Sequence, residues 1–402
     1  MTIPRYYTGL GAGAGRAPGT ELPQLRVHDI TDPGDYLAAP DLAAAVDVAL
    51  TLGMPLLLTG EPGSGKSALA DSVAQELRFG HPRPARDLRF PVKSTTEARD
   101  LFYTFDTVGR FHASQTAGAD ADARDFIRFQ ALGLALLRAK PLAFARDILK
   151  LDMERLDHPG EPLRSVVLID EIDKAPRDVP NDILVELETM TFDIPELAAG
   201  RGQVHRVALD PDSDEAQRRP LVIFTSNREQ TLPEPFLRRC VFHHLSFPRF
   251  RAGDGREITI ERIVARRLGK RYAGDNVGQR RVQRAIDFFA YLREPEQERR
   301  IGRCPTLAEL LNWLDWLLPP VGADGSPGGP EDWHALAALD ALWQQGAEDP
   351  AKAAPSAADG ARRLLCIGTE SLLLKRPRDG NAVPAETLLG DWATDPKRRS
   401  TD

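Results

Sequence analysis

Cysteine is scarce in this sequence, and several other features that define whole classes of protein are missing as well. The three cysteines, Cys240, Cys304 and Cys366, lie far apart among 402 residues, which excludes a disulfide framework and leaves no C-x-x-C metal pair. No run of about 18 apolar residues occurs, so we expect no membrane insertion. The opening segment, MTIPRYYTGLGAGAGRAPGT, lacks the apolar core of a signal peptide. Together these absences predict a cytoplasmic location.

Neither sign of charge dominates the chain. Its 52 Lys and Arg residues face 59 Asp and Glu residues, for a formal net charge of −7. Surfaces that bind nucleic acid are usually basic, so this balance argues against general nucleic-acid binding. Hydrophobic residues make up 42% and charged residues 28%, which excludes a disordered or fibrous chain. The length predicts two or three domains, each able to bury a core.

Composition and periodicity divide the chain into four parts. Residues 1–25 are rich in Gly and Pro and predict a flexible N-terminal segment. Residues 26–248 predict an α/β domain, whereas 249–318 show helical periodicity without a convincing strand. The last part, 319–402, begins with a Gly/Pro-rich linker at 321–332 and continues as a helical extension.

The α/β prediction rests on apolar runs separated by helical patterns. One helical pattern starts at Asp41, and another places Ile183, Leu184, Leu187 and Met190 on a single face. Buried strands that alternate with helices indicate a parallel sheet covered on both sides. The runs that suit buried strands are 54–60, 88–95, 165–170, 221–227 and 241–247.

The helical region carries a clear helix start. Thr306 and Glu309 match the capping-box pattern, in which each side chain bonds the other residue's backbone N–H. The segment that follows carries its leucines on one stripe, which predicts a helix packed on that side. These are Leu307, Leu310, Leu311 and Leu314.

The strongest signal for function is GEPGSGKS, residues 60–67, which matches G-x-x-x-x-G-K-[ST]. It lies between a predicted strand and a predicted helix, the context in which such a loop binds phosphate through its backbone N–H groups. Lys66 would lie on the β and γ phosphates, and the Ser67 hydroxyl would ligate Mg²⁺. The predicted nucleotide-binding residues are Gly60, Glu61, Pro62, Gly63, Ser64, Gly65, Lys66, Ser67 and Ala68.

A second signal is SVVLIDEIDKAP, residues 165–176, an apolar strand that ends in two acids. Ligands of α/β folds bind at the carboxyl edge of the sheet, where Asp170 and Glu171 would lie. We expect Asp170 to hold Mg²⁺ and Glu171 to polarise the attacking water. Since no N-K-x-D guanine-reading motif is present, the expected nucleotide is ATP.

A third signal is the strand LVIFTSN, residues 221–227, which ends in polar side chains. From there Asn227 could hydrogen-bond the γ-phosphate or the attacking water. A strand-ending Asn in an ordinary turn is the alternative interpretation.

With these motifs in order, the sequence resembles the AAA+ ATPases, and more narrowly their MoxR branch. The similar segments are AVDVALTLGMPLLLTGEPGSGKS, VVLIDEIDKAPRDVPNDILVELE, VIFTSN and LPEPFLRRCVFHHLSFP, within residues 35–318. The resemblance implies a P-loop core with a five-stranded parallel sheet flanked by helices, plus a small all-helical lid. It also implies a homo-oligomeric ring, usually a hexamer, that binds ATP and Mg²⁺ between subunits.

The resemblance assigns roles to several further residues. It makes Asn227 the sensor 1 residue and places Arg239 at the arginine-finger position, facing the γ-phosphate of a neighbouring subunit; Arg238 is an adjacent candidate. Arg303, just before the Thr306 cap, resembles the sensor 2 residue of the lid, although the wording around it departs from the commoner lid sequence. Because a cation is unfavourable near a helix N-terminus, an anion should face Arg303. The predicted catalytic set is Lys66, Glu171, Asn227, Arg239 and Arg303.

The long spacing between the phosphate loop and Asp170 predicts that much of 103–160 is inserted relative to a minimal core. The resemblance implies that residues 102–115 correspond to the family's helix-2 insert and residues 191–209 to its hairpin before sensor 1. In related machines such insertions face the ring axis and grip a partner. The Phe and Tyr residues in the first insert also suit ordinary packing.

The leading functional hypothesis is an ATP-driven remodeller with chaperone-like action on a protein client. Its client is unknown; von Willebrand A-domain proteins are common partners of MoxR relatives. A nucleic-acid motor or loader is a second hypothesis, which the acidic balance disfavours. A nucleotide-gated switch with little turnover is a third, and a monomeric small-molecule kinase would share the phosphate loop without the arginine finger.

Overall fold

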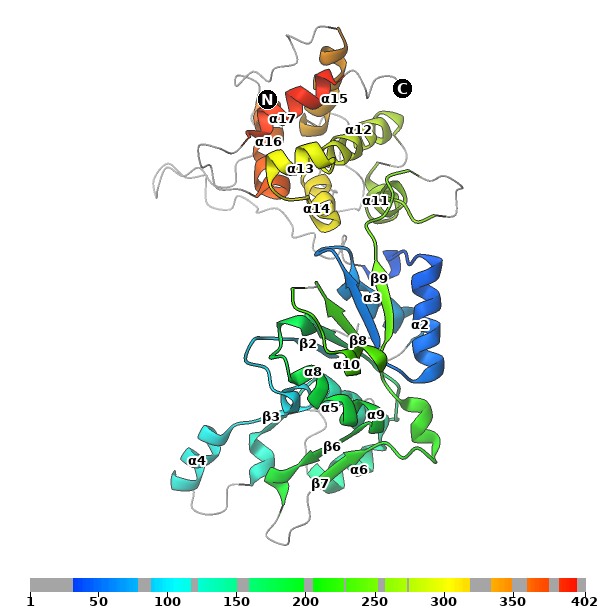
Figure 1. Cartoon of the computed structure of the whole chain (residues 1–402), viewed down its shortest axis with the longest axis vertical. Coiled ribbons are helices and arrows are strands. Elements are labelled where there is room, and N and C mark those ends of the chain that lie inside the picture. The colour runs from blue at the N-terminus through cyan, green and yellow to red at the C-terminus, as the bar shows by residue number, and fades with distance from the viewer. Residues whose placement is uncertain are drawn as a thin grey trace, which may run out of the picture. The chain divides into compact units, whose positions relative to one another are not determined.

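The computed structural model divides into two units, and each is described by itself. The core unit spans Ala38–Phe247, and the helical unit contains the described residues up to Leu37 and from Pro248 onward (Figure 1). The predicted flexible segment 1–25 and linker 321–332 lie outside the described residues. Those are 32–78, 88–116, 122–149, 158, 160–198, 205–227, 229–251, 257–272, 275–318, 334–348, 360–375 and 383–395.

The core unit is built on a five-stranded parallel sheet, as the sequence predicts, in the order β2-β5-β8-β1-β9. Strands β1 and β8 are buried along their whole length, which fits the apolar runs with which they begin. In the register of the sheet, Leu58 of β1 pairs with Thr225 of β8. The strands are β1 (Leu56–Gly60), β2 (Arg89–Pro91), β5 (Val166–Asp170), β8 (Leu221–Ser226) and β9 (Val241–Leu245).

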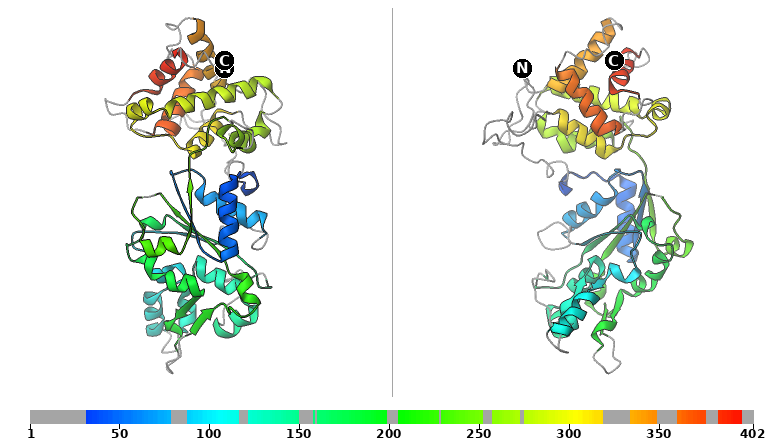
Figure 2. Two further views of the ribbon diagram at one scale, coloured as in Figure 1. Left: turned by 45° about the vertical axis from the view of Figure 1, so that its right-hand side comes forward. Right: turned by 90° about the vertical axis from the view of Figure 1, so that its left-hand side faces the viewer.

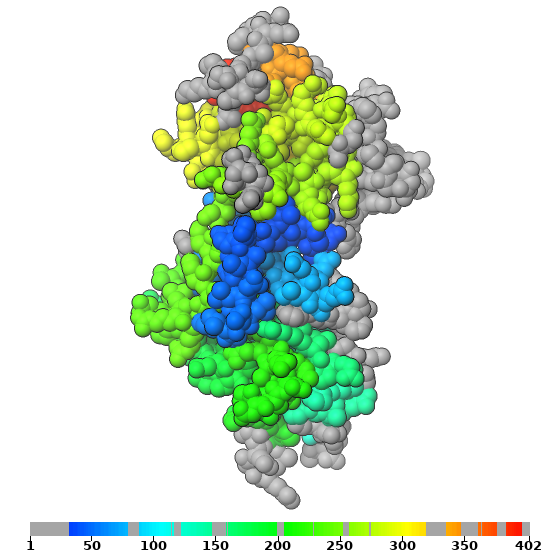
Figure 3. Space-filling view, turned by 90° about the vertical axis from the view of Figure 1, so that its right-hand side faces the viewer, coloured from blue at the N-terminus to red at the C-terminus, as the bar shows by residue number. Residues whose placement is uncertain are grey.

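Helices flank this sheet. Helix α2 packs on β1 and β9, α3 on β1, β5 and β8, and α5 on β5; α2 and α3 run alongside the strands in Figure 2. Figure 3 shows α2 in blue on the surface of the core unit. The helical elements of this unit are α2 (Pro40–Leu52), α3 (Lys66–Glu76), η3 (Ala98–Leu101), α4 (Thr107–Thr116), η4 (Ala123–Phe126), α5 (Ala131–Ala139), α6 (Leu142–Leu149), η5 (Ile172–Lys174), α8 (Val179–Asp182), α9 (Leu184–Thr189), η6 (Pro195–Leu197), η7 (Asp214–Arg218) and α10 (Glu234–Arg238).

The helical pattern predicted over residues 181–190 forms two short helices, because α8 ends at Asp182 and α9 starts at Leu184. The shared apolar face is nevertheless present, since its four residues are all buried in the core. They are Ile183, Leu184, Leu187 and Met190.

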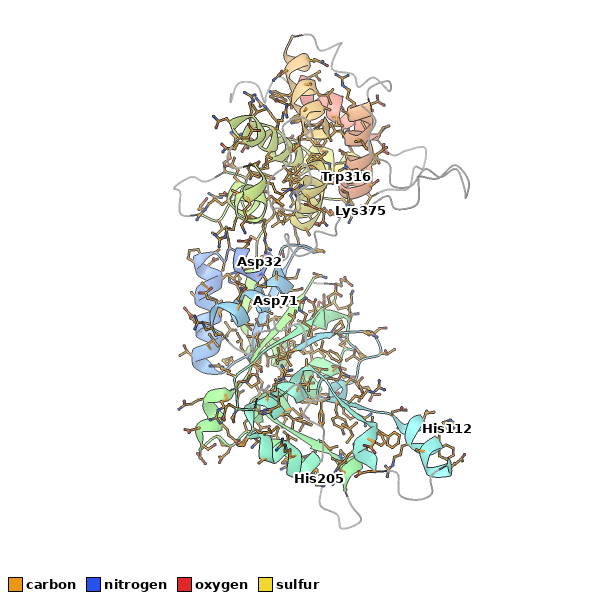
Figure 4. The ribbon with its side chains drawn as sticks, turned by 180° about the vertical axis from the view of Figure 1, so that it is seen from behind. Asp32, Asp71, His112, His205, Trp316 and Lys375 are labelled. Atoms are coloured by element: carbon orange, nitrogen blue, oxygen red, sulfur yellow. The ribbon has the colours of Figure 1, made fainter. Side chains whose placement is uncertain are left out.

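Two antiparallel hairpins extend the core unit beyond the sheet. One pairs β3 (Tyr103–Phe105) with β4 (Ile127–Phe129), and the other pairs β6 (Thr191–Ile194) with β7 (His205–Ala208). The second lies within the predicted hairpin segment 191–209. Figure 4 labels His112 on α4 and His205 on β7, at the same end of the core unit.

The helical unit contains the predicted helix after Thr306, with both halves of the capping box formed. Helices on both sides of residue 318 pack together, because α15 contacts α12 and α14 as well as α16 and α17. None of the described helices combines the length and apolarity needed to cross a bilayer. The elements are η1 (Pro33–Asp35), α11 (Ile260–Leu268), η8 (Gly269–Arg271), α12 (Asn276–Leu292), α13 (Pro295–Ile301), α14 (Leu307–Leu317), α15 (His334–Glu348), α16 (Gly360–Gly368), the π-helix η11 (Thr369–Leu374) and α17 (Ala385–Thr394).

Candidate active site

The predicted phosphate loop joins the end of β1 at Gly60 to the start of α3 at Lys66. Gly65 adopts φ +94° at the N-cap of α3, a left-handed conformation that side chains disfavour. A Cβ on Gly60 would lie 2.5 Å from the carbonyl oxygen of Leu245 on β9. The glycines at these two positions are therefore required by the path of the loop itself.

Lys66 is buried at the base of this loop, with 6% of its surface exposed. Its Nζ donates hydrogen bonds to the backbone oxygens of Gly60 and Glu61, both at 2.9 Å. Burial lowers the pKa of Lys66, although the nearby carboxylates of Asp170 and Asp173 act in the opposite direction. The ammonium group is thus held inside the loop, facing its carbonyl oxygens.

The predicted metal ligands Ser67 and Asp170 are in direct contact. Ser67 Oγ donates to Asp170 Oδ1 at 2.9 Å and to Oδ2 at 3.1 Å. Thr225, from the neighbouring strand β8, also donates its hydroxyl to Asp170 Oδ1. Oxygen atoms of this kind are the ligands that Mg²⁺ prefers, so Ser67 and Asp170 fit a magnesium ion.

Glu171 follows at the end of β5 with a left-handed backbone, φ +61°. Its N–H donates to Thr225 Oγ1 at 2.9 Å, which ties β5 to β8. Both side-chain oxygens are engaged, since Oε1 accepts from Asn227 Nδ2 at 3.0 Å and Oε2 from Lys174 Nζ at 2.6 Å. The pair with Glu171 raises the pKa of Lys174. The structure therefore brings the predicted Glu171 and Asn227 together.

Asp173 is a buried neighbour that the sequence analysis did not single out. It lies on η5, two residues after Glu171, with 2% of its surface exposed. Its Oδ2 accepts the backbone N–H groups of Asn227 at 3.1 Å and Glu229 at 2.9 Å. The aspartate in D-E-I-D was the available signal, but acids that follow a strand are common in exposed turns.

Residues 56–249 match the family model described as ATPase family associated with various cellular activities (AAA). These residues form an AAA ATPase domain. No curated protein matches the chain. The match begins in β1 and ends just beyond β9, so the AAA domain coincides with the sheet that carries the site. Members of this family bind nucleotide, typically with Mg²⁺, and typically form oligomeric rings.

The two finger candidates of the AAA domain lie at the end of α10. Arg238 pairs with Glu234 at 3.1 Å, and its side chain is 76% exposed. The Nε of Arg239 lies 3.7 Å from Glu188 Oε2, and this side chain is 51% exposed. Within one chain, Arg238 therefore pairs with a carboxylate of α10 and Arg239 with a carboxylate of α9. The candidate site residues at the loop and at the ends of β5 and β8 instead form hydrogen bonds with one another.

Both arginines also border a cavity of about 200 Å³ in the core unit. Its apolar lining comes from the loop after α2 and from α9 and α10, including Met54, Leu187 and Phe236. The exposed guanidinium groups therefore lie beside a concave apolar surface of the same unit.

The predicted sensor 2 residue, Arg303, belongs to the helical unit and faces an anion from its own chain. It donates to Glu309 Oε2, and Lys375 Nζ lies 2.9 Å from Glu309 Oε1; Lys375 is labelled in Figure 4. Burial alone would raise the pKa of Glu309, but Arg303, the Thr306 N–H and Lys375 together hold it below its usual value. The anion expected near Arg303 is thus a carboxylate of the capping box.

The aromatic residues of the first predicted insert divide into two groups. Phe102 and Tyr103 are buried and pack on Phe192 of β6, and the Tyr103 hydroxyl donates to Glu196 Oε2 at 2.8 Å. Phe111 on α4 is 60% exposed. The buried group joins the two hairpins of the AAA domain, which is the packing role foreseen as one alternative.

Proposed function

We propose that this chain is a Mg²⁺-dependent, ATP-hydrolysing ring ATPase of the MoxR type. In this proposal it acts in the cytoplasm, remodels or activates a protein client, and uses residues 249–318 as its lid. The contact between Ser67 and Asp170, beside the contact between Glu171 and Asn227, is the observation that carries the proposal. These side chains come from the phosphate loop and from two adjacent strand ends, and each has the chemistry that phosphoryl transfer to water needs.

The proposed roles follow from what each side chain can do. Lys66 exchanges the carbonyl oxygens of Gly60 and Glu61 for phosphate oxygens as nucleotide binds. Ser67 and Asp170 hold Mg²⁺, which when bound neutralises phosphate charge. Glu171 accepts a proton from the attacking water through its carboxylate, and Asn227 orients that water or the γ-phosphate.

Catalysis in a ring adds a group from the neighbouring copy. The exposed Arg239 completes the site of the adjacent subunit, where its guanidinium spreads charge over the developing oxygens. A hexamer fits the resemblance. Arg303 acts as sensor 2 once it exchanges Glu309 for a phosphate oxygen. The client remains a protein of unidentified class, for which a von Willebrand A-domain protein is the first candidate to test.

A nucleotide-gated switch with little turnover is a second candidate, and one observation favours it. Each oxygen of Glu171 already accepts a hydrogen bond, one from Lys174 and one from Asn227, which makes the carboxylate a weaker base toward water. A chain that kept this arrangement with ATP bound would bind nucleotide and hydrolyse it slowly.

The deciding experiment is ATP turnover measured against protein concentration, with particle size measured by light scattering. For a ring, specific activity rises with concentration, and Arg239→Ala abolishes turnover while ATP binding persists. Arg238→Ala, at the adjacent and more exposed arginine, is the matched control and should retain turnover. Mixing Arg239→Ala with Glu171→Gln restores part of the turnover, because some interfaces then contain two intact halves.

The opposite pattern would reject the ring. Turnover that is independent of dilution and of Arg239 would mean that Arg239 is not a finger. A monomeric switch or kinase would then replace the ring machine.

A further inference from the structure

Asp173 is a buried carboxylate beside Glu171 and Asn227. It is almost fully buried, and the only hydrogen bonds to its carboxylate among the described residues reach Oδ2, while its buried Oδ1 has no hydrogen-bond partner. A buried oxygen without a partner lowers stability, so such a group calls for a role other than stability.

The two hydrogen bonds that Asp173 receives both hold the chain just after β8. Asn227 and Glu229 give their backbone N–H groups to the same oxygen, at 3.1 and 2.9 Å. Hydrogen bonds to a charged acceptor are about twice as strong as neutral ones. Asp173 therefore fixes the backbone from which the side chain of Asn227 projects.

The turn that contains Asp173 also binds the side chain of Asn227, through Glu171. Glu171 accepts from Asn227 Nδ2, while Asp173, two residues later, accepts from Asn227 N. Glu171 is in turn tied to β8 through Thr225. The side-chain amide and the backbone N–H of one residue are thus bound by two carboxylates that lie on a single short turn.

We propose that Asp173 is the positioning residue for Asn227: it holds the backbone after β8 so that the Asn227 amide meets Glu171 at the reaction site. This inference rests on the proposed ATPase function. In this role Asp173 acts on the rate through Asn227, in addition to its electrostatic effect on the pKa of Lys66. Losing it lets the Asn227 amide drift from its place, and displacements of about 1 Å can cost on the order of 100-fold in rate.

The test measures kcat and KM for Mg²⁺-ATP in the full-length protein at concentrations where turnover per chain is constant. Asp173→Ala should lower kcat about 100-fold and leave KM nearly unchanged, because the phosphate loop is intact. Asp173→Asn keeps one neutral acceptor oxygen, so its kcat should fall between the wild type and Asp173→Ala. Asp182→Ala, at an exposed aspartate of α8, is the matched control and should leave both constants unchanged.

A double-mutant cycle separates positioning from a structural role. Because Asp173 acts through Asn227, the pair Asp173→Ala/Asn227→Ala should have the kcat of Asn227→Ala alone. Effects that multiply, or a kcat for Asp173→Ala equal to that of the control, overturn the inference. So does a fall in nucleotide affinity together with a lower melting temperature in both Asp173 variants, which would indicate a purely structural group.

These results also distinguish this inference from the proposed function. A wild-type protein that does not hydrolyse ATP overturns both. A hydrolysing wild type in which Asn227→Ala is slow but Asp173→Ala is not overturns only the role of Asp173.

Discussion

The core unit and the helical unit each hold a carboxylate at the start or end of a structural element, but they hold it with different partners. In the core unit, Asp170 accepts from two hydroxyl groups, those of Ser67 and Thr225. In the helical unit, Glu309 lies between two cations, Arg303 and Lys375.

This difference decides what each cluster can do next. Neutral donors orient Asp170 without cancelling its charge, so the charge stays available to a divalent cation. The charge of Glu309 is already compensated inside the unit by Arg303 and Lys375, so the guanidinium group of Arg303 is already in an ion pair. The core cluster is thus ready for its ligand, whereas Arg303 must first give up an ion pair.

The largest effect on turnover is expected from a substitution at Asp170. Asp170→Asn keeps the shape and an acceptor for Ser67 but removes the charge, so we expect turnover to fall by about 100-fold or more at fixed Mg²⁺. Turnover against Mg²⁺ concentration measures the effect, with Asp182→Asn, at an exposed residue of α8, as the control. An unchanged magnesium dependence would place the ion elsewhere.

Acid should act on the helical cluster through Glu309. Because the folded pKa of Glu309 is lowered, its charge stabilises the fold above the unfolded pKa near 4.5, and this stabilisation is lost as pH falls through the folded pKa. The melting temperature of the wild type should therefore fall more steeply below about pH 4.5 than that of Glu309→Gln. Calorimetry between pH 6 and 3 would show it; parallel curves contradict the ion-pair account.

The smallest effect is expected at Lys174, whose Nζ donates to Glu171 Oε2 at 2.6 Å. Its pair with Glu171 is partly exposed, and Lys174→Met removes the hydrogen bond to Glu171 Oε2, so kcat should rise about two- to fivefold. Steady-state turnover at saturating ATP measures it, with the exposed Lys270→Met as control. A fall in kcat would make Lys174 part of the catalytic apparatus and would also weaken the case for a switch.

Local sequence patterns were enough to predict the sheet and the residues on the loop and strand ends. Apolar runs indicate strands, and the phosphate loop and the D-E pair are contiguous motifs. The contribution of Thr225 was not predictable in the same way, because it depends on β8 lying between β1 and β5. Strand order of that kind is set by packing of the whole domain.

Two other features escaped prediction for related reasons. The break at Ile183 interrupts a continuous apolar pattern, so periodicity alone favours one helix. Lys375 reaches Glu309 from the end of η11, a segment distant in the sequence, and such a tertiary ion pair leaves no local signature. Asp173 was visible in the motif, but its burial was not.

The left-handed backbone of Glu171 has a consequence for how this protein tolerates change. Residues other than glycine cost on the order of 1 kcal/mol or more in this conformation. Glycine at position 171 would relax the backbone while removing the carboxylate that the reaction needs. A survey that scores variants by their abundance in the cell would therefore favour a substitution at position 171 that a survey of turnover would reject. The disagreement between the two surveys would identify position 171 as functional without any knowledge of the nucleotide.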